Sequence, residues 1–168
     1  MDISQLITPE RVKCLDNISS KKRTLEVLSQ LLASGAEGVD PTHVFHQLIE
    51  RERLGSTGLG HGVALPHGRI SPPENTIGDE APSQPVTLGC FIKLEQGIDF
   101  DSPDSKPADL LFGLLVPKDC TDEHLQILAA LAQMFSDTSL CEQLRHCSTN
   151  EALYAQLFDW AQTHKIAS

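Results

Sequence analysis

The segment ADLLFGLLVP, residues 108–117, restricts the fold of this chain more than any other part of the sequence. From Leu110 its apolar run is unbroken until Pro117, which is typical of a strand buried on both faces in the interior of a sheet. PVTLGCFIKL, residues 85–94, predicts a second strand, because its apolar residues alternate at a period of two. A sheet that buries strands in this way needs helices around it.

Patterns typical of helices precede these strands. Leucines at helical spacing predict a helix over about 21–33, with Ser19 or Ser20 as its N-cap. A second helix is predicted to begin after Asp40, with a proline at its first position, and to stop at Gly55. This second helix leads directly into a glycine-rich segment.

The last third of the sequence predicts three further helices. Their expected N-caps are Thr121, Asp137 and Ser148, and Glu151 stands at capping-box spacing from the last of these. The first of the three helices is expected to turn a stripe of apolar residues inward. That stripe consists of Leu125, Leu128, Ala129, Ala132 and Phe135.

Charge, hydropathy and length exclude several classes of protein. The net charge of −10 opposes contact with a phosphate backbone, so we expect no nucleic-acid partner. No stretch approaches the roughly 18 consecutive apolar residues of a membrane span, and the amino terminus lacks the pattern of a signal peptide, so we expect a cytoplasmic protein. The 168 residues are expected to form one domain, residues 1–168, with an exposed proline-rich loop at about 71–85.

The cysteines and most histidines give no sign of a metal site. The five cysteines are odd in number and form no CxxC pair, so we expect reduced core residues. His43 and His46 are spaced for chelation, but neither an HExxH motif nor a cysteine-rich partner accompanies them. We therefore expect neither a metal nor a cofactor.

The segment GSTGLGHGVALPHGR, residues 55–69, holds a histidine in a stiff setting. Pro66 fixes its own φ angle and restricts Leu65, so the chain enters His67 in an extended form. Gly68 then allows the chain to turn away at little steric cost. We expect His67 at a boundary between strand and loop, with its backbone held and its ring accessible, as a reactive side chain needs.

The glycines before His67 admit two interpretations. Glycine-rich backbone can approach an anion closely and direct several N–H groups at it, which would make this a phosphate-binding loop. The candidate residues for that role are Ser56, Thr57, Gly58, Gly60 and Gly68. Because the segment matches neither the GxxxxGK[ST] nor the GxGxxG nucleotide motif in its required context, a plain turn-rich connection is the alternative.

Two further side chains are candidates for the same site. Arg51 lies at the rim of the apolar stripe of the second helix, where its guanidinium suits an anion bound by the glycines; an ion pair within the helix or on the surface is the alternative. His124 follows Thr121 at the third helical position, where a neutral imidazole can donate to a phosphate oxygen; an exposed, solvated histidine is the alternative. Glu52 falls near the middle of the stripe, which is explained either if Glu52 is the buried partner of a positive group or if the helix frays there.

The stretch ERERLGSTGLGHGVALPHGR closely resembles the active-site segment of enzyme IIA domains of the fructose and mannitol type, from the bacterial phosphoenolpyruvate-dependent phosphotransferase system. The resemblance continues through KPADLLFGLLVPKDCTDEHLQILAAL and covers most of the chain. Within this group, the GSTG motif and the apolar strand look most like the nitrogen-regulatory enzyme IIA. The pattern G-x-A-x-P-H-G around the histidine is a far more specific signal than the glycines alone.

This resemblance implies that His67 is the phosphorylated histidine, that Arg51 lies near the phosphate and that His124 is the second histidine beside it. It also implies a three-layer α/β/α fold with a mixed sheet of about four or five strands. The implied function is that of a cytoplasmic phosphocarrier, which accepts a phosphoryl group from an HPr-like donor and regulates partner proteins by its phosphorylation state.

Two other functions remain open, and the chain departs from the family pattern at two places. A sugar-transport enzyme IIA would pass the phosphoryl group to a IIB domain, whereas a regulatory binding module would keep the fold without the chemistry. One departure is the proline-rich loop at about 71–85, which looks longer than is usual in the family and bears on which partner docks nearby. The other is His61, where relatives often carry asparagine or glutamine and which is close enough to His67 in sequence to face the same site.

Overall fold

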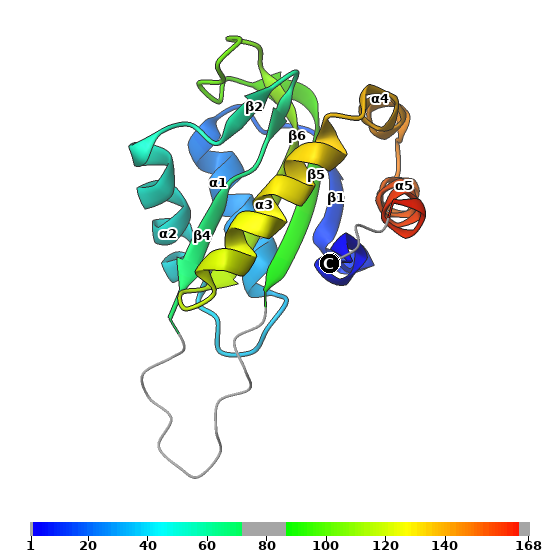
Figure 1. The fold of residues 1–168 in the computed structure, drawn as a ribbon. Coiled ribbons are helices and arrows are strands. Elements are labelled where there is room, and N and C mark those ends of the chain that lie inside the picture. Colours follow the sequence, from blue (N-terminus) through cyan, green and yellow to red (C-terminus); the bar gives the residue numbers. More distant parts are fainter. Residues whose placement is uncertain (1, 72–86, 165–168) are drawn as a thin grey trace.

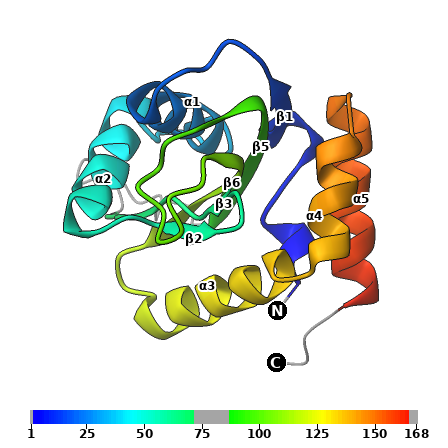
Figure 2. The same ribbon diagram turned by 90° about the horizontal axis from the view of Figure 1, so that it is seen from above.

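A mixed sheet between two layers of helices organises the molecule. The computed structural model describes residues 2–71 and 87–164, and within these ranges the sheet has six strands. Helices cover both of its faces, so the expected three-layer α/β/α fold is confirmed (Figure 1, Figure 2). Apart from Ser71, the proline-rich loop expected at 71–85 lies outside the described residues.

Two long antiparallel strands form the centre of the sheet, and short strands flank them. The strands are β1 (Val12–Leu15), β2 (Gly58–Gly60), β3 (Val63–Ala64), β4 (His67–Ile70), β5 (Leu88–Ile98) and β6 (Ala108–Pro117). β5 pairs with β6, while β1 runs parallel to β5 on one side. On the other side, β3 and β4 both run parallel to β6, and β2 pairs antiparallel with β3. The strands predicted around 85–94 and 108–117 are therefore the central pair.

The described part of the chain has more strands than the four or five expected. β1, β2, β3 and β4 contain four residues or fewer, which is too short for a period of two to be recognised in the sequence. The amino-terminal segment, for which the sequence predicted no element, also forms two 3₁₀ turns, Ile3–Gln5 and Pro9–Arg11.

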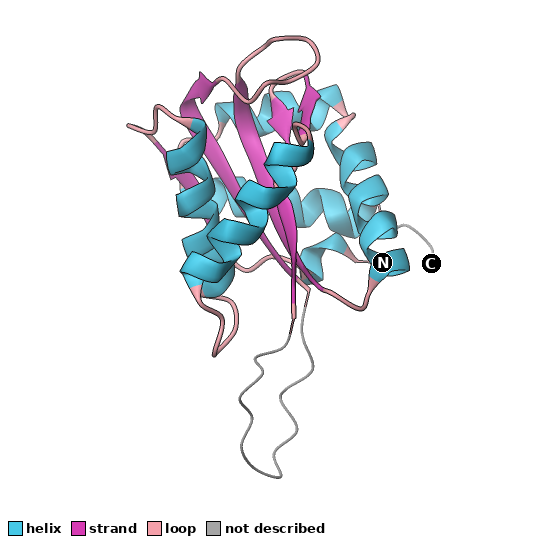
Figure 3. Ribbon diagram, turned by 90° about the vertical axis from the view of Figure 1, so that its left-hand side faces the viewer, coloured by secondary structure: helices cyan, strands magenta, loops and turns pink. Residues whose placement is uncertain are grey.

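Two groups of helices cover the two faces of the sheet. They are α1 (Lys21–Ala33), α2 (Pro41–Leu54), α3 (Thr121–Phe135), α4 (Thr138–His146) and α5 (Asn150–Thr163). Helices α1 and α2 pack on one face, and α3, α4 and α5 lie on the other (Figure 2, Figure 3). Each predicted helix is present, and its bounds agree with the expected ones to within a few residues.

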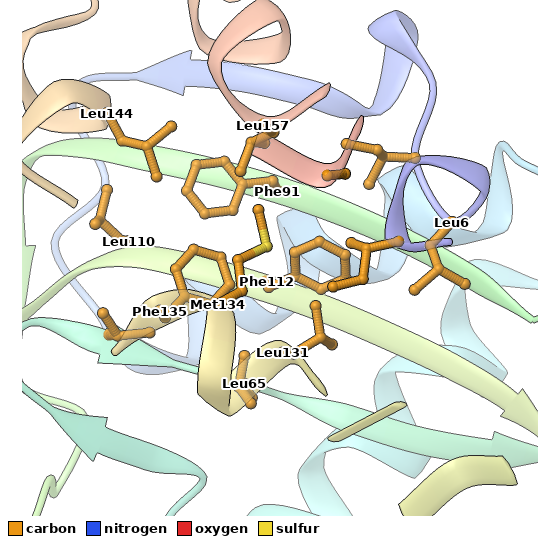
Figure 4. Packing of buried hydrophobic residues seen from close by; sticks show 14 of the residues in the cluster. Leu6, Leu65, Phe91, Leu110, Phe112, Leu131, Met134, Phe135, Leu144 and Leu157 are labelled. Carbon is orange, nitrogen blue, oxygen red and sulfur yellow. The ribbon is translucent and has the colours of Figure 1, made fainter. Parts of the chain in front are cut away.

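Side chains of the central strands divide the core into two clusters, one on each face of the sheet. On the side of α3, Phe91 stacks on Phe135 with ring centroids 5.7 Å apart, and Phe112 lies 6.2 Å from Phe135 (Figure 4). On the side of α1, Leu28 packs with Ile92 in the second cluster. From Leu110 to Val116, the apolar side chains of β6 alternate between the two clusters, which explains why this part of its sequence has no polar side chain.

The helix N-caps agree with the sequence at three helices and differ at two. Ser20, Asp40 and Asp137 each accept a hydrogen bond from a backbone N–H in the first turn of their helix. Thr121 is not the cap of α3, because Cys120 holds that position without a side-chain hydrogen bond. Thr149, rather than Ser148, caps α5.

The start of α5 is set by a contact with a distant strand. Oδ1 of Asn150 accepts a hydrogen bond from the backbone N–H of Cys14 at 2.7 Å. Because this contact joins the first residue of α5 to β1, tertiary structure decides between two neighbouring hydroxyl residues that suit the cap equally well.

The buried face of α3 differs from the predicted stripe. The predicted residue Leu125 is 60% exposed. The residues that the helix buries are His124, Ile127, Ala130, Leu131, Met134 and Phe135. Alanine and leucine occupy almost the whole circumference of this helix, so its rotation is decided by the packing of Phe135 against the sheet and not by periodicity.

The cysteines are free thiols. Cys90, Cys141 and Cys147 are buried, as expected of core residues, whereas Cys14 and Cys120 are partly exposed. In residues 2–71 and 87–164, none of the helices is both long and apolar enough to cross a bilayer.

Candidate active site

The candidate site lies at β4, between one helix from each layer. Strand β4 pairs with β6, and it runs between α2 and α3 (Figure 1). His67 is the first residue of this strand, and the chain continues through Ile70 without turning. The expectation that Gly68 lets the chain turn away is therefore wrong. A Cβ atom at Gly68 would lie 3.1 Å from the Cβ of Gln47, so glycine allows α2 to approach the strand closely.

Both ring nitrogens of His67 have a hydrogen-bond partner. Nδ1 lies 2.8 Å from the backbone oxygen of Leu65, and Nε of Arg51 donates to Nε2 at 3.2 Å. A guanidinium can only donate, so Nε2 of His67 carries the lone pair. Nδ1 therefore carries the proton, and it donates a hydrogen bond to the backbone oxygen of Leu65. The ring is thus held as the neutral tautomer, with a nucleophilic Nε2 next to a cation.

The end of α2 is fixed so that Arg51 faces this ring. Nη1 of Arg51 donates to the backbone oxygen of Gly55 at 2.8 Å, which leaves Nε directed at His67. The next residue, Glu52, has a side chain only 5% exposed and forms an ion pair with Lys21 at 3.0 Å. It also accepts from the hydroxyl of Thr57. Glu52 is therefore the buried partner of a positive group, and this ion pair ties α2 to α1.

His124 completes the arrangement from the other layer. Its ring lies 5.1 Å from that of His67, centroid to centroid, at an interplanar angle of 70°. Nε of Arg69 donates to Nδ1 of His124 at 3.2 Å, whereas Nε2 is buried and has no hydrogen-bond partner among the described residues. A buried polar atom without a partner is costly in a folded protein, which makes Nε2 of His124 a candidate to contact a ligand.

A pocket opens beside these side chains. It has a volume of about 560 Å³ and is lined from α2, β4 and α3. Its residues include His67, Gly68, Arg69, His124 and Arg51. Three leucines line it as well, and two of them, Leu54 from α2 and Leu125 from α3, are 85% and 60% exposed. The three predicted side chains His67, Arg51 and His124 thus meet in one pocket.

Most of the residues proposed as a phosphate-binding loop lie elsewhere. Gly68 lines the pocket, but Ser56, Thr57, Gly58 and Gly60 do not. The hydroxyl of Ser56 donates to the backbone oxygen of Phe100 at 2.6 Å, and both the amide and the hydroxyl of Thr57 donate to Glu52. The polar groups of these two residues are therefore used within the fold.

His61 faces a different cleft. It sits in the turn between β2 and β3 with a φ of 56°, and its N–H donates to Asp104 at 2.8 Å. This cleft has a volume of about 690 Å³, and its wall includes Arg145, which forms an ion pair with Asp109 at 2.9 Å. The idea that His61 shares the site of His67 is therefore not supported.

Burial controls the charge of both site histidines. His67 is 8% exposed and His124 is 5% exposed. Burial lowers the pKa of His67 below its ordinary value, and the nearby Arg51 and Arg69 lower it further, although the hydrogen bond to Leu65 opposes them. Burial, with His67 and the two arginines, lowers the pKa of His124 to about 4. Both rings are therefore neutral near pH 7.

This charge state predicts how stability depends on pH. His124 takes up a proton at about pH 6.5 in the unfolded chain but only at about pH 4 in the folded one, so stability is lost as the pH falls through this window. A His124→Gln variant lacks this ionisation. From pH 7 to pH 4, the free energy of unfolding of the native chain should fall by up to about 3 kcal/mol more than that of the variant.

Urea unfolding at a series of pH values measures this difference. Each protein gives a curve of the free energy of unfolding against pH. Subtracting the curve of the variant from that of the native chain removes the contribution of the carboxylates, which both proteins share. Parallel curves across this pH range would contradict a buried neutral His124.

Arg69 is the site residue that sequence reasoning missed. It stands two residues after His67, so on a continuing strand the two side chains point to the same face. That signal was present in the sequence, but the interpretation of Gly68 as a turn concealed it.

The arrangement can hold an anion between the neutral imidazole of His67, the guanidinium of Arg51 and the unpartnered Nε2 of His124. An oxyanion group of phosphorus or sulfur attached to Nε2 of His67 would lie next to Arg51 and His124. The low exposure of the two rings would strengthen both contacts. Within the described ranges, no group of three or more His, Cys, Asp or Glu side chains is arranged to hold a metal ion.

Comparison with known proteins finds a matching family and several chains of similar sequence. Residues 5–160 match the family model for the phosphoenolpyruvate-dependent sugar phosphotransferase system, EIIA 2. A nitrogen regulatory protein from Pseudomonas aeruginosa is 40% identical over 159 residues, which cover 94% of this chain and 95% of that protein. A fructose-specific EIIA component from Haloferax volcanii is 31% identical over 152 residues, which cover 90% of this chain and 92% of that protein.

A solved structure with the same fold agrees with these matches. The crystal structure of the nitrogen regulatory protein IIA-Ntr from Neisseria meningitidis superposes with a TM-score of 0.76 at 39% sequence identity. The superposition covers 92% of this chain and 98% of that chain, so the similarity extends through both layers of helices.

Proposed function

This chain belongs to the EIIA type 2 family of the phosphoenolpyruvate-dependent sugar phosphotransferase system, and we propose from this premise that His67 accepts a phosphoryl group from an HPr-like donor. The product is a phosphohistidine, and its presence or absence controls the binding of regulatory target proteins. The observation that carries the proposal is the state of the His67 ring, whose Nε2 lone pair is held beside Arg51 and near an unpaired N–H of His124.

The transfer requires one bond to form and one to break. The Nε2 lone pair of His67 attacks the phosphorus of the donor phosphohistidine in line with the P–N bond, whose electron pair returns to the donor ring. Nδ1 of His67 keeps its proton, because its N–H donates a hydrogen bond to the backbone oxygen of Leu65 throughout the transfer. As the new P–N bond forms, the N–H of Arg51 stops donating to the Nε2 lone pair of His67 and donates to a phosphoryl oxygen instead.

Electrostatics supplies most of the catalysis. The transition state of phosphoryl transfer spreads negative charge over three oxygens, so donors fixed in advance stabilise it. The guanidinium of Arg51 and the Nε2–H of His124 are such donors on either side of His67. Because the pKa of His67 is lowered, the nucleophile is already neutral at pH 7 and no base is needed.

The rim of the pocket supports a protein as the donor. Leu54 and Leu125 are 85% and 60% exposed on opposite sides of His67, and exposed apolar side chains next to a reactive group are typical of a protein contact. A donor that carries its phosphohistidine on an apolar face would cover both leucines and exclude water from the transfer.

Intact-mass measurement tests the proposal. Incubation of the full chain with phosphoenolpyruvate, enzyme I and an HPr-like donor should add the mass of one phosphoryl group. The added group should be lost in acid and retained in base, as expected of a P–N bond. An unchanged mass would contradict the proposal and favour a regulatory binding module that lacks the chemistry.

A sugar-transport role is the second candidate, because the fructose-specific relative is 31% identical over 92% of its length. The regulatory role is preferred, since the relative at 40% identity is a nitrogen regulatory protein. A IIB domain added to the phosphorylated chain separates the two roles. Retention of the phosphoryl group supports regulation, and its passage to the IIB domain supports transport.

A further inference from the structure

Strand geometry places Arg69 beside both site histidines. Because alternate residues of a strand share a face, Arg69 points to the same side of β4 as His67, toward α3. There its Nε donates to Nδ1 of His124 at 3.2 Å. The contact joins the strand that carries the nucleophile to the helix that carries the second histidine.

This contact decides where the proton of His124 lies. A guanidinium has N–H donors and no acceptor, so Nδ1 of His124 must offer its lone pair to Arg69. The proton of the neutral ring is then on Nε2. That nitrogen is the one that is buried and has no hydrogen-bond partner among the described residues. A free N–H therefore remains on a ring that lines the pocket and whose centroid lies 5.1 Å from that of the His67 ring.

We propose that Arg69 is a positioning residue, which occupies Nδ1 of His124 and so keeps the Nε2–H of that ring available to the phosphoryl group on His67. The identity of the ligand is taken from the proposed function. Arg69 acts through His124 and needs no contact with the phosphoryl group. The guanidinium at Nδ1 also opposes protonation of His124, so near pH 7 the ring serves as a neutral donor and not as an acid that would deliver a proton to the P–N bond.

The charges around His124 favour the same state. Arg69 and His67 face it from β4 and Arg51 faces it from α2. On its own helix, Asp122 and Glu123 lie in the first turn. The two arginines oppose a positive ring, and the burial of the ring opposes it more strongly.

Nuclear magnetic resonance of the histidine rings in the unphosphorylated full chain tests this role. In the native protein, His124 should carry its proton on Nε2 and titrate far below pH 6.5. In Arg69→Met, which removes the donor, both tautomers should be present and the titration midpoint should rise by about one pH unit. Arg69→Lys keeps a cationic donor and should restore part of the native behaviour.

A matched control removes the same charge nearby. Arg53 is exposed on α2, where it pairs with Glu50 at 2.6 Å, and it does not line the pocket. Arg53→Met should leave the tautomer and the midpoint of His124 unchanged. Equal midpoints in Arg69→Met and Arg53→Met, or a proton on Nδ1 of His124 in the native chain, would overturn the proposal.

The rate of phosphoryl uptake gives a second measurement. Arg69→Met should slow uptake about tenfold or more, the scale of effect when a functional histidine loses the partner that orients it. An unchanged rate would contradict a role in transfer. If the native chain takes up no phosphoryl group, the proposed function fails, but the resonance experiment still decides the state of His124 because it needs no donor.

Discussion

Replacement of His67 by alanine is expected to abolish phosphoryl uptake completely. The nucleophile is the Nε2 lone pair of this ring, and in the structure the other site histidine, His124, presents an N–H instead. The lone pair of His124 lies on Nδ1, on the side of the ring that faces Arg69 and not Arg51. Intact mass after incubation with the phosphorylated donor measures the effect directly.

Two controls separate loss of the nucleophile from loss of the fold. His67→Gln preserves much of the side-chain volume of a residue that is 8% exposed, and it should also take up nothing while unfolding near the native temperature. His61→Asn changes a histidine in the same glycine-rich segment, at a positive φ that asparagine tolerates, and should be phosphorylated normally. A phosphoryl group on the alanine variant would show that the acceptor is another residue.

Replacement of Arg51 by methionine is expected to slow phosphoryl transfer by a factor of about 10² to 10³. Arg51 is the charged donor in contact with Nε2 of His67, and the transition state brings the phosphoryl oxygens to that position. Arg51→Lys should recover only part of the rate, because an ammonium lacks the planar fork that contacts Gly55 and His67 together. Rapid-quench time courses at low acceptor concentration give kcat/KM for each variant.

Arg53→Met serves as the control for the charge of Arg51. It removes a guanidinium two residues away on the same helix, where the side chain pairs with Glu50 outside the contact with His67. Its rate should stay within about threefold of the native one, as is usual for an exposed residue that makes only a surface ion pair. Equal rates for Arg51→Met and Arg53→Met would show that Arg51 contributes only a general electrostatic field.

The parts of the fold that the sequence predicts are those with long, consistent patterns. The apolar run that became β6 and the leucine spacing of α1 each specify one element and one way of burying it. In α3 the apolar residues surround most of the helix, so the sequence allows more than one rotation, and the contact of Phe135 with the sheet selects one. Short strands such as β4 form because β6 offers a partner, which no local pattern reveals.

In the site, too, the sequence predicts the residues that a local pattern marks and misses those that depend on contacts with distant residues. His67 could be found because proline and glycine mark its setting locally, and Arg51 because helical spacing places it near the following segment. Arg69 could not be found once Gly68 was interpreted as a turn, although the close approach of Gln47 is what requires glycine there. The hydroxyls of Ser56 and Thr57 bond to Phe100 and Glu52, and no spacing rule predicts those partners.

The central claim is that the resting protein holds His67 neutral, with its proton on Nδ1 and its reactive lone pair on Nε2. The most direct measurement is the coupling between phosphorus and ring nitrogen in the ¹⁵N-labelled, phosphorylated chain. We predict a phosphorus coupled to Nε2 of His67 and a proton retained on Nδ1. A phosphoryl group on Nδ1, or on any other histidine, would contradict this account of the site.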